Sequence, residues 1–93
     1  MIRNFKDKEA ELIFIRTFSH RLPHGIQKAA FRKFRMLSRA VTLNDLRVPP
    51  ANRLEALHGS RRGQHSIRIN DQWRVCFVWR TGDAYNVEIV DCR

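Results

Sequence analysis

Residues 65–89 read HSIRINDQWRVCFVWRTGDAYNVEI, and this stretch decides the fold because apolar side chains recur in it at every second position. Such alternation is typical of strands that bury one face. It predicts three strands of an antiparallel meander, with turns at 70–72 and at about 81–83. A further strand from about Arg53 to Leu57 is expected to join this sheet. The residues expected on the buried face are His65, Ile67, Ile69, Trp73, Val75, Phe77, Trp79, Tyr85, Val87 and Ile89.

Strand parity also predicts the register of the first hairpin, because a slip of one residue would exchange the two faces of a strand. A continuous apolar face requires a loop of about three residues and the pairs Ile69–Trp73, Ile67–Val75 and His65–Phe77. The same register puts Arg68 across from Arg74 on the opposite face, where two like charges repel. Either an anionic ligand lies between them, or the guanidinium groups turn into water or pair with Asp91 or Glu88.

Two helices are predicted before the sheet. The first runs from an N-cap at Asp7 to about Phe18, and the second from about Pro23 or Ile26 to Arg39. Their apolar faces are expected to comprise Leu12, Ile13, Ile15 and Phe18 in the first helix, and Ile26, Ala30, Phe34, Leu37 and Val41 in the second. Residues 42–52 form a connection. The predicted fold class is α+β, with two N-terminal helices packed on one face of a small, mainly antiparallel sheet. Residues 1–93 are expected to form a single domain.

The second helix also carries a regular row of cations on the side away from its apolar face. The row consists of Lys28, Arg32, Arg35 and Arg39, at spacings of three and four. It is either a solvated helix surface or a surface that follows phosphates or binds a partner.

The charge balance predicts a polyanionic partner. Eighteen Lys and Arg against nine Asp and Glu give a formal net charge of +9, and fourteen of the eighteen are Arg, whose planar fork suits phosphate. A dense cluster between residues 53 and 77 contains Arg53, Arg61, Arg62, Arg68 and Arg74, together with His58 and His65. We expect the partner to be RNA.

Neither a membrane nor an oxidising compartment is indicated. We find no apolar run long enough to span a bilayer, and acidic residues interrupt the N-terminal apolar segment, so a cytoplasmic location is expected. The two cysteines form neither a disulfide framework nor a metal-binding spacing, and Cys76 is interpreted as a small core residue. We predict no metal site, and the absence of a phosphate-binding loop predicts no nucleotide cofactor.

RNA can be cut without a metal when its own 2′-hydroxyl attacks the adjacent phosphorus, provided that the protein supplies a base, an acid and cations. Arg68 and Arg74, with Arg61 as a third candidate, would hold the phosphate. His58 is either a catalytic group, since histidine is a common acid or base, or an exposed loop histidine. Glu55 and Asp91 would act as bases or orient arginines. His65 falls on the apolar face and is interpreted as a core residue.

The segments RLEAL, SIRINDQWRVCF and GDAYNVEIVD, together with MIRNFKDKE and DLRVPPANRLEAL, resemble the HigB group of RelE-like toxins over nearly the whole chain. This resemblance implies a RelE-like fold and a toxin that cuts mRNA in the ribosomal A site. It also implies a helix-turn-helix antitoxin of the HigA kind as partner, which inhibits the toxin. By position, Arg74 matches a family active-site arginine and Asp91 the acidic residue near the C-terminus. Glu55 and His58 fall where other members place a catalytic histidine or lysine.

The chain departs from the family at its end. Family members usually finish Asp-Tyr-His, whereas this chain finishes Asp91-Cys92-Arg93. Arg93 could bind phosphate but cannot act as a base at neutral pH. Two hypotheses follow: a ribosome-dependent mRNA endonuclease, or a catalytically weakened or inactive module that binds antitoxin or RNA. The residues predicted to bind RNA beside the catalytic set are Arg61, Arg62, Arg93, Lys28, Arg32, Arg35 and Arg39.

Overall fold

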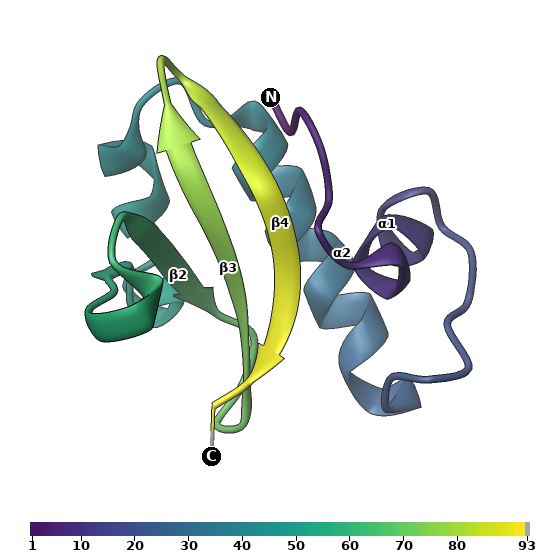
Figure 1. Ribbon diagram of the computed structural model, residues 1–93. Coiled ribbons are helices and arrows are strands. Elements are labelled where there is room, and N and C mark those ends of the chain that lie inside the picture. The colour runs from purple at the N-terminus through teal and green to yellow at the C-terminus, as the bar shows by residue number, and fades with distance from the viewer. Residues whose placement is uncertain (93) are drawn as a thin grey trace.

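The computed structural model describes residues 1–92, which form two α-helices and a four-stranded antiparallel sheet of order β1-β2-β3-β4 (Figure 1). The helices are α1 (Lys8–Phe14) and α2 (His24–Arg39), and the strands are β1 (Glu55–Ala56), β2 (Gln64–Arg68), β3 (Trp73–Arg80) and β4 (Asp83–Asp91). Three short 3-10 helices occupy Leu43–Arg47, Pro50–Asn52 and Gly59–Arg61. In Figure 1, α2 passes behind the sheet, and the N-terminal segment runs along the outer edge of β4 toward α1. The predicted α+β architecture is confirmed.

The predicted register of the β2–β3 hairpin is also confirmed. Ile67 pairs with Val75, His65 with Phe77, and Arg68 with Arg74. The Ile69 amide donates to the Trp73 carbonyl at 2.9 Å, across a loop of the expected length. The Asn70 side chain closes this loop, because its Oδ1 accepts hydrogen bonds from the amides of Gln72 and Trp73. The core therefore lies between the helices and one face of the sheet, with Phe34, Leu37, Ile67, Val75 and Phe77 fully buried.

The alternation predicted for β4 is wrong at its first half. Asn86 has a φ of 52° and forms a bulge, so Tyr85 lies opposite Val78 and Ala84 opposite Trp79. Ala84 is consequently the buried residue, and Tyr85 faces the open side of the sheet. A bulge adds one residue to a strand and exchanges its faces beyond that point, which a period of two cannot indicate.

The N-terminal segment closes the outer edge of β4. Ile2 and Phe5 form parallel bridges with Ala84 and Val87. Asn4 reinforces this pairing, because its side-chain amide exchanges hydrogen bonds with the amide and side chain of Asn86. Backbone groups in the first half of β4, at Ala84 and Val87, are therefore satisfied within the chain.

The first helix is shorter than predicted. Asp7 caps it as expected, with its Oδ1 accepting from the Glu9 amide at 2.9 Å. It ends at Phe14 because Arg16 adopts a left-handed conformation (φ 64°) in a Schellman arrangement, in which the amides of residues 17 and 16 donate to the carbonyls of residues 12 and 13. Phe18 therefore lies beyond the helix and is 45% exposed.

The second helix matches its prediction at both ends, and its buried residues are Ile26, Ala30, Phe34 and Leu37. Val41 was expected on the same face, but Ala40 is extended and Val41 is 74% exposed. The first strand is also shorter than the predicted Arg53–Leu57, because Arg53 is left-handed (φ 45°) and cannot continue a ladder. Neither helix within residues 1–92 is both long and apolar enough to cross a membrane.

Candidate active site

An arginine pocket of about 270 Å³ opens where β2 ends, β3 begins and β4 ends. It is lined by Arg53, Arg68, Asn70, Asp71, Arg74 and Cys92. The backbone assembles this lining from four parts of the chain. The 3-10 helix Pro50–Asn52 delivers Arg53, and the Cys92 amide donates to the Gln72 carbonyl at 2.7 Å, which ties the end of β4 to the hairpin loop.

Arg74 is the fixed cation of the pocket. Its Nε donates to Ser66 Oγ at 2.8 Å, and its Nη2 donates to the Arg53 carbonyl at 2.7 Å. Ser66 is fully buried, so this acceptor holds the guanidinium firmly. Glu55 Oε1 lies 3.7 Å from Nη2. A guanidinium has five N–H donors, so it can meet these acceptors and an incoming phosphate together.

Arg68 faces Arg74 across the hairpin, as the register predicted, and is paired differently from Arg74. Its guanidinium forms an ion pair with Asp71, a side chain that is 95% exposed. The two like charges are thus relieved by Asp71 and Glu55, whereas Asp91 and Glu88 were the partners considered from the sequence. An exposed ion pair contributes little stability, so a phosphate could replace the Asp71 carboxylate at Arg68.

Asp91 lies near the pocket without lining it. It is opposite Trp73 in the register, so strand alternation puts it on the helix-covered side of the sheet and Arg74 on the open side. Its Oδ2 accepts from Gln72 Nε2 at 3.1 Å. Within residues 1–92, the C-terminal residue that reaches the pocket lining is Cys92.

The segment between β1 and β2 carries the other predicted groups. Glu55 lies on the open side beside Arg74, whereas His58 is exposed at the start of the 3-10 helix and does not line the arginine pocket. Arg61 Nη1 donates to Glu88 Oε2 at 3.0 Å and to Gln64 Oε1 at 3.1 Å. The hydrogen bond that Arg61 donates to Glu88 raises the pKa of Arg61.

The remaining predicted residues lie outside the arginine pocket. Arg62 is exposed at the end of the same 3-10 helix. Lys28, Arg32, Arg35 and Arg39 are all exposed along α2, in the helical layer. Arg93 lies outside the described residues. The structure therefore brings together Arg68, Arg74 and Glu55, and it leaves the α2 row as a separate surface.

Two predictions about buried groups are confirmed. Cys76 is 2% exposed, and burial raises the pKa of its thiol to about 11, so it is an inert structural residue. His65 is half-buried on the core side and stacks on Phe77, with ring centroids 6.3 Å apart. Burial lowers the pKa of His65. No group of three His, Cys, Asp or Glu residues that could hold a metal occurs within residues 1–92.

The sequence assigned no role in the site to Arg53, Asn70, Asp71 or Cys92. Arg53 was visible only as a member of the basic cluster, and its left-handed conformation, which turns its carbonyl toward Arg74, has no sequence signal in a non-glycine residue. Asn70 and Asp71 were recognised as turn residues, and their place in the lining follows from the geometry of that turn.

Comparison with known proteins identifies a family for this chain. Residues 3–92 match the family described as the RelE-like toxin of the type II toxin-antitoxin system HigB. Toxin HigB-1 of Vibrio cholerae is 45% identical over 87 residues, which cover 92% of this chain and 92% of that protein. An uncharacterized protein of Haemophilus influenzae is 36% identical over 67 residues, covering 72% of this chain and 66% of its own. Endoribonuclease HigB of Proteus vulgaris is 28% identical over 91 residues, covering 98% of both chains.

Proposed function

This chain belongs to the HigB-like family of RelE-like toxins, and on that premise we propose that it is a ribosome-dependent endonuclease that cuts mRNA and thereby inhibits translation. Membership of a toxin–antitoxin family implies an antitoxin partner, and we propose a helix-turn-helix protein of the HigA kind. The endoribonuclease name of the Proteus vulgaris relative supports the nuclease part of the proposal.

The observation that carries the proposal is the arginine pocket, in which Arg53, Arg68 and Arg74 surround about 270 Å³ of space. Three arginines around one cavity favour an anion with several oxygens, such as a phosphodiester. Because Arg74 is already held by Ser66 and the Arg53 carbonyl, it needs little reorganisation when negative charge develops on the phosphate.

The proposed reaction is attack of the RNA 2′-hydroxyl on the adjacent phosphorus, with departure of the 5′-oxygen of the next nucleotide. Arg74 and Arg68 would stabilise the pentacovalent transition state. Glu55 is the proposed base, because its carboxylate lies 3.7 Å from Arg74 and so near the phosphate that Arg74 would hold. His58 is exposed outside the arginine pocket, and it is the proposed acid for the leaving oxygen where the bound RNA passes over the segment between β1 and β2. Asp91 would hold the hairpin loop through Gln72, and Arg61 and Arg62 would contact the flanking RNA.

A second candidate function is a module that binds antitoxin or RNA without cutting. The observation that favours it is the presence of Cys92 in the pocket lining, at the position where family members usually carry tyrosine. A thiol cannot supply the stacking surface for a base that an aromatic ring would provide.

Purified protein, ribosomes programmed with a defined message and primer extension would separate the two functions. The endonuclease should produce new 5′ ends on the programmed message and none on the same message without ribosomes. Induced expression should also arrest growth. Intact messages together with normal growth, while soluble protein accumulates, would rule out the nuclease and favour the binding module.

A further inference from the structure

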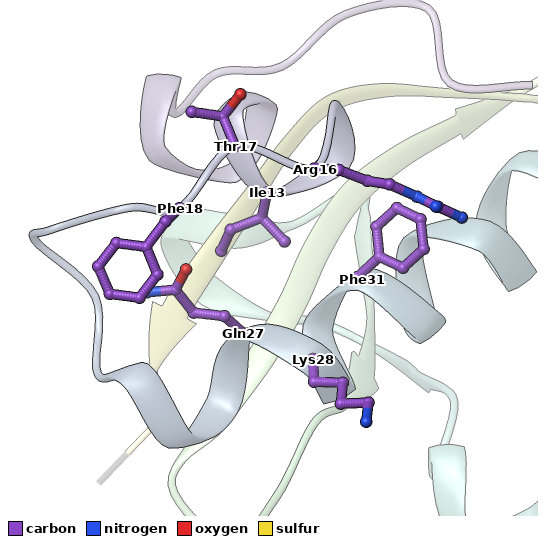
Figure 2. Close-up of a pocket in the computed structure, with 7 residues that line it drawn as sticks. All are labelled: Ile13, Arg16, Thr17, Phe18, Gln27, Lys28 and Phe31. Atoms are coloured by element: carbon purple, nitrogen blue, oxygen red, sulfur yellow. The ribbon is translucent and has the colours of Figure 1, made fainter.

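A second concave surface lies on the helical side of the molecule. Its first hollow has a volume of about 340 Å³ and is lined by Ile13, Arg16, Thr17, Phe18, Gln27, Lys28 and Phe31. Figure 2 shows Phe18 and Phe31 on opposite sides of Ile13, which lies between them on α1. Ile13 is buried, whereas Phe18 is 45% exposed, so the hollow combines an apolar floor with an accessible aromatic wall.

This hollow is preformed, because hydrogen bonds fix the loop that borders it. Ser19 is fully buried, and its hydroxyl donates to Glu9 on α1. Gln27 on α2 donates to the carbonyls of Ser19 at 2.7 Å and Leu22 at 3.0 Å. The early end of α1 at Phe14 leaves Ile15 and Phe18 outside the helix, with 61% and 45% of their surfaces exposed.

A second hollow of about 320 Å³ continues the first along α2. It is lined by Phe14, Arg16, Phe31, Arg35, Ser38 and Arg39, so the two hollows share Arg16 and Phe31. We call the joined surface the α1–α2 groove. It follows α2 from Gln27 to Arg39, a length of about 18 Å at a helical rise of about 1.5 Å per residue. This length corresponds to about three turns of a docked helix.

The rim of the α1–α2 groove is cationic. Arg16, Lys28, Arg35 and Arg39 line it, and no Asp or Glu is found in the lining that residues 1–92 provide. The Phe31 ring is covered by two of these cations, with Arg16 at 4.9 Å and Arg35 at 5.9 Å from its centroid. A nucleobase could stack on Phe31 only by displacing a guanidinium, and phosphates gain nothing from the apolar floor. A second copy of this chain, also at +9, would be repelled.

We propose that the α1–α2 groove docks an acidic amphipathic helix of a protein partner. Large apolar side chains of that helix, three or four residues apart, would enter the two hollows, and its Asp and Glu residues would pair with the rim cations. The sequence did not decide whether the cationic row on α2 contacts phosphates or a protein partner. Because Lys28, Arg35 and Arg39 of this row line the α1–α2 groove, the proposal assigns these three residues to contacts with a protein. The inference rests on the proposed function in one respect, since it takes the antitoxin as the source of the helix.

A designed peptide tests the groove independently of any toxin activity. The probe is a fluorescein-labelled peptide of about 20 residues that carries leucine at a helical spacing of three and four, with glutamate at most other positions. A second peptide has the same composition in an order that removes the apolar face. Fluorescence anisotropy at 0.15 M salt measures both peptides, and a single-stranded RNA of about 12 nucleotides, against the full-length protein.

Arg16→Glu should weaken binding of the amphipathic peptide at least tenfold, and Phe18→Ser about fivefold, with Tm measurements establishing that both variants fold. Arg16→Gln removes the charge without introducing a negative one, so its affinity for the amphipathic peptide should lie between those of wild type and Arg16→Glu. Arg47→Glu changes an exposed cation of the 3-10 helix Leu43–Arg47, which is not part of the lining of either hollow, and should have less than a twofold effect.

Equal binding of the two peptides, or equal losses in Arg16→Glu and Arg47→Glu, would overturn the proposal. A loss of RNA binding in Arg16→Glu with peptide binding intact would identify the groove as a nucleic-acid surface instead. Growth arrest is measured separately on the same variants. If wild type fails to arrest growth while the peptide results hold, the proposed nuclease fails and the docking groove stands.

Discussion

The arginine pocket and the α1–α2 groove are both cationic, yet their surroundings differ. In the pocket, Arg74 is held by the buried Ser66 hydroxyl and by the Arg53 carbonyl, and most of the lining residues are charged or polar. In the groove, Arg16 and Arg35 lie over the ring of Phe31, beside an apolar floor. Fixed donors favour an anion at a defined position, whereas cations around an apolar floor favour a side chain with both characters. Net charge alone does not distinguish these two uses.

The largest expected effect would separate the two regions completely. Arg74→Ala should lower the rate of message cleavage by about a hundredfold or more, because a preorganised donor to the transition state is removed. Arg74→Lys should also be impaired, since an ammonium cannot reach both Ser66 and the Arg53 carbonyl in the same way. Binding of the acidic peptide at the groove should be unchanged in both variants. Cleavage assays and anisotropy on the same preparations check this, and a parallel loss of both activities would contradict the separation.

The second-largest expected effect is a loss of stability at Asn52, which supports the segment that leads into the arginine pocket. Asn52 is fully buried directly before Arg53, accepts from Lys33 Nζ at 2.6 Å and donates to the Leu46 carbonyl at 3.2 Å. Asn52→Ala should lower the free energy of unfolding by about 2 kcal/mol, because buried polar groups lose their partners. The exposed Asn44→Ala is the matched control. Urea denaturation measures both, and equal midpoints would show that Asn52 has no such role.

A third substitution would add an aromatic ring to the arginine pocket, on which an RNA base could stack. Cys92→Tyr should raise ribosome-dependent cleavage by about tenfold, because stacking of a base on an aromatic ring contributes roughly 1–3 kcal/mol. Cys92→Ser, which keeps the size of the side chain, is the control and should leave the rate near that of wild type. Single-turnover cleavage of a programmed message gives both rates. A rate for Cys92→Tyr below that of wild type would show that the pocket does not use an aromatic residue there.

The smallest expected effect is a pH dependence of stability that arises from His65, a residue outside both the arginine pocket and the α1–α2 groove. Burial holds the pKa of His65 below its value of 6.5 in the unfolded chain. As the pH falls from 7 through 6.5, the unfolded chain takes up this proton before the folded protein does, so stability should decrease on acidification. His65→Gln should reduce that slope, whereas the exposed His20→Gln should not. Urea midpoints between pH 5.5 and 7.5 measure the slopes, and equal slopes for wild type and His65→Gln would contradict the assignment.

Sequence periodicity was sufficient for the β2–β3 hairpin, because a continuous apolar face allows only one parity of Ile67 against Val75. That parity alone predicted that Arg68 and Arg74 face each other. Periodicity failed at two residues other than glycine whose backbone is left-handed: at Asn86, which exchanges the faces of β4, and at Arg16, which ends α1. Arg53 is a third such residue, and its carbonyl completes the contacts of Arg74. The residue types at these positions do not indicate a left-handed backbone, because tertiary packing is what stabilises that conformation there.

The closed edges of the sheet restrict how this molecule can meet any other chain. On one side residues 2 and 5 already pair with β4, and on the other side β1 ends after two residues, next to the left-handed Arg53. Within residues 1–92, the N-terminal segment covers the first half of β4 and β1 covers the middle of β2, so the rows of free backbone groups are short and strand addition by a visiting peptide is disfavoured. Recognition is therefore left to side chains, and a partner has to select this protein by charge and shape instead of by backbone pairing. The same geometry disfavours stacking of copies into fibrils.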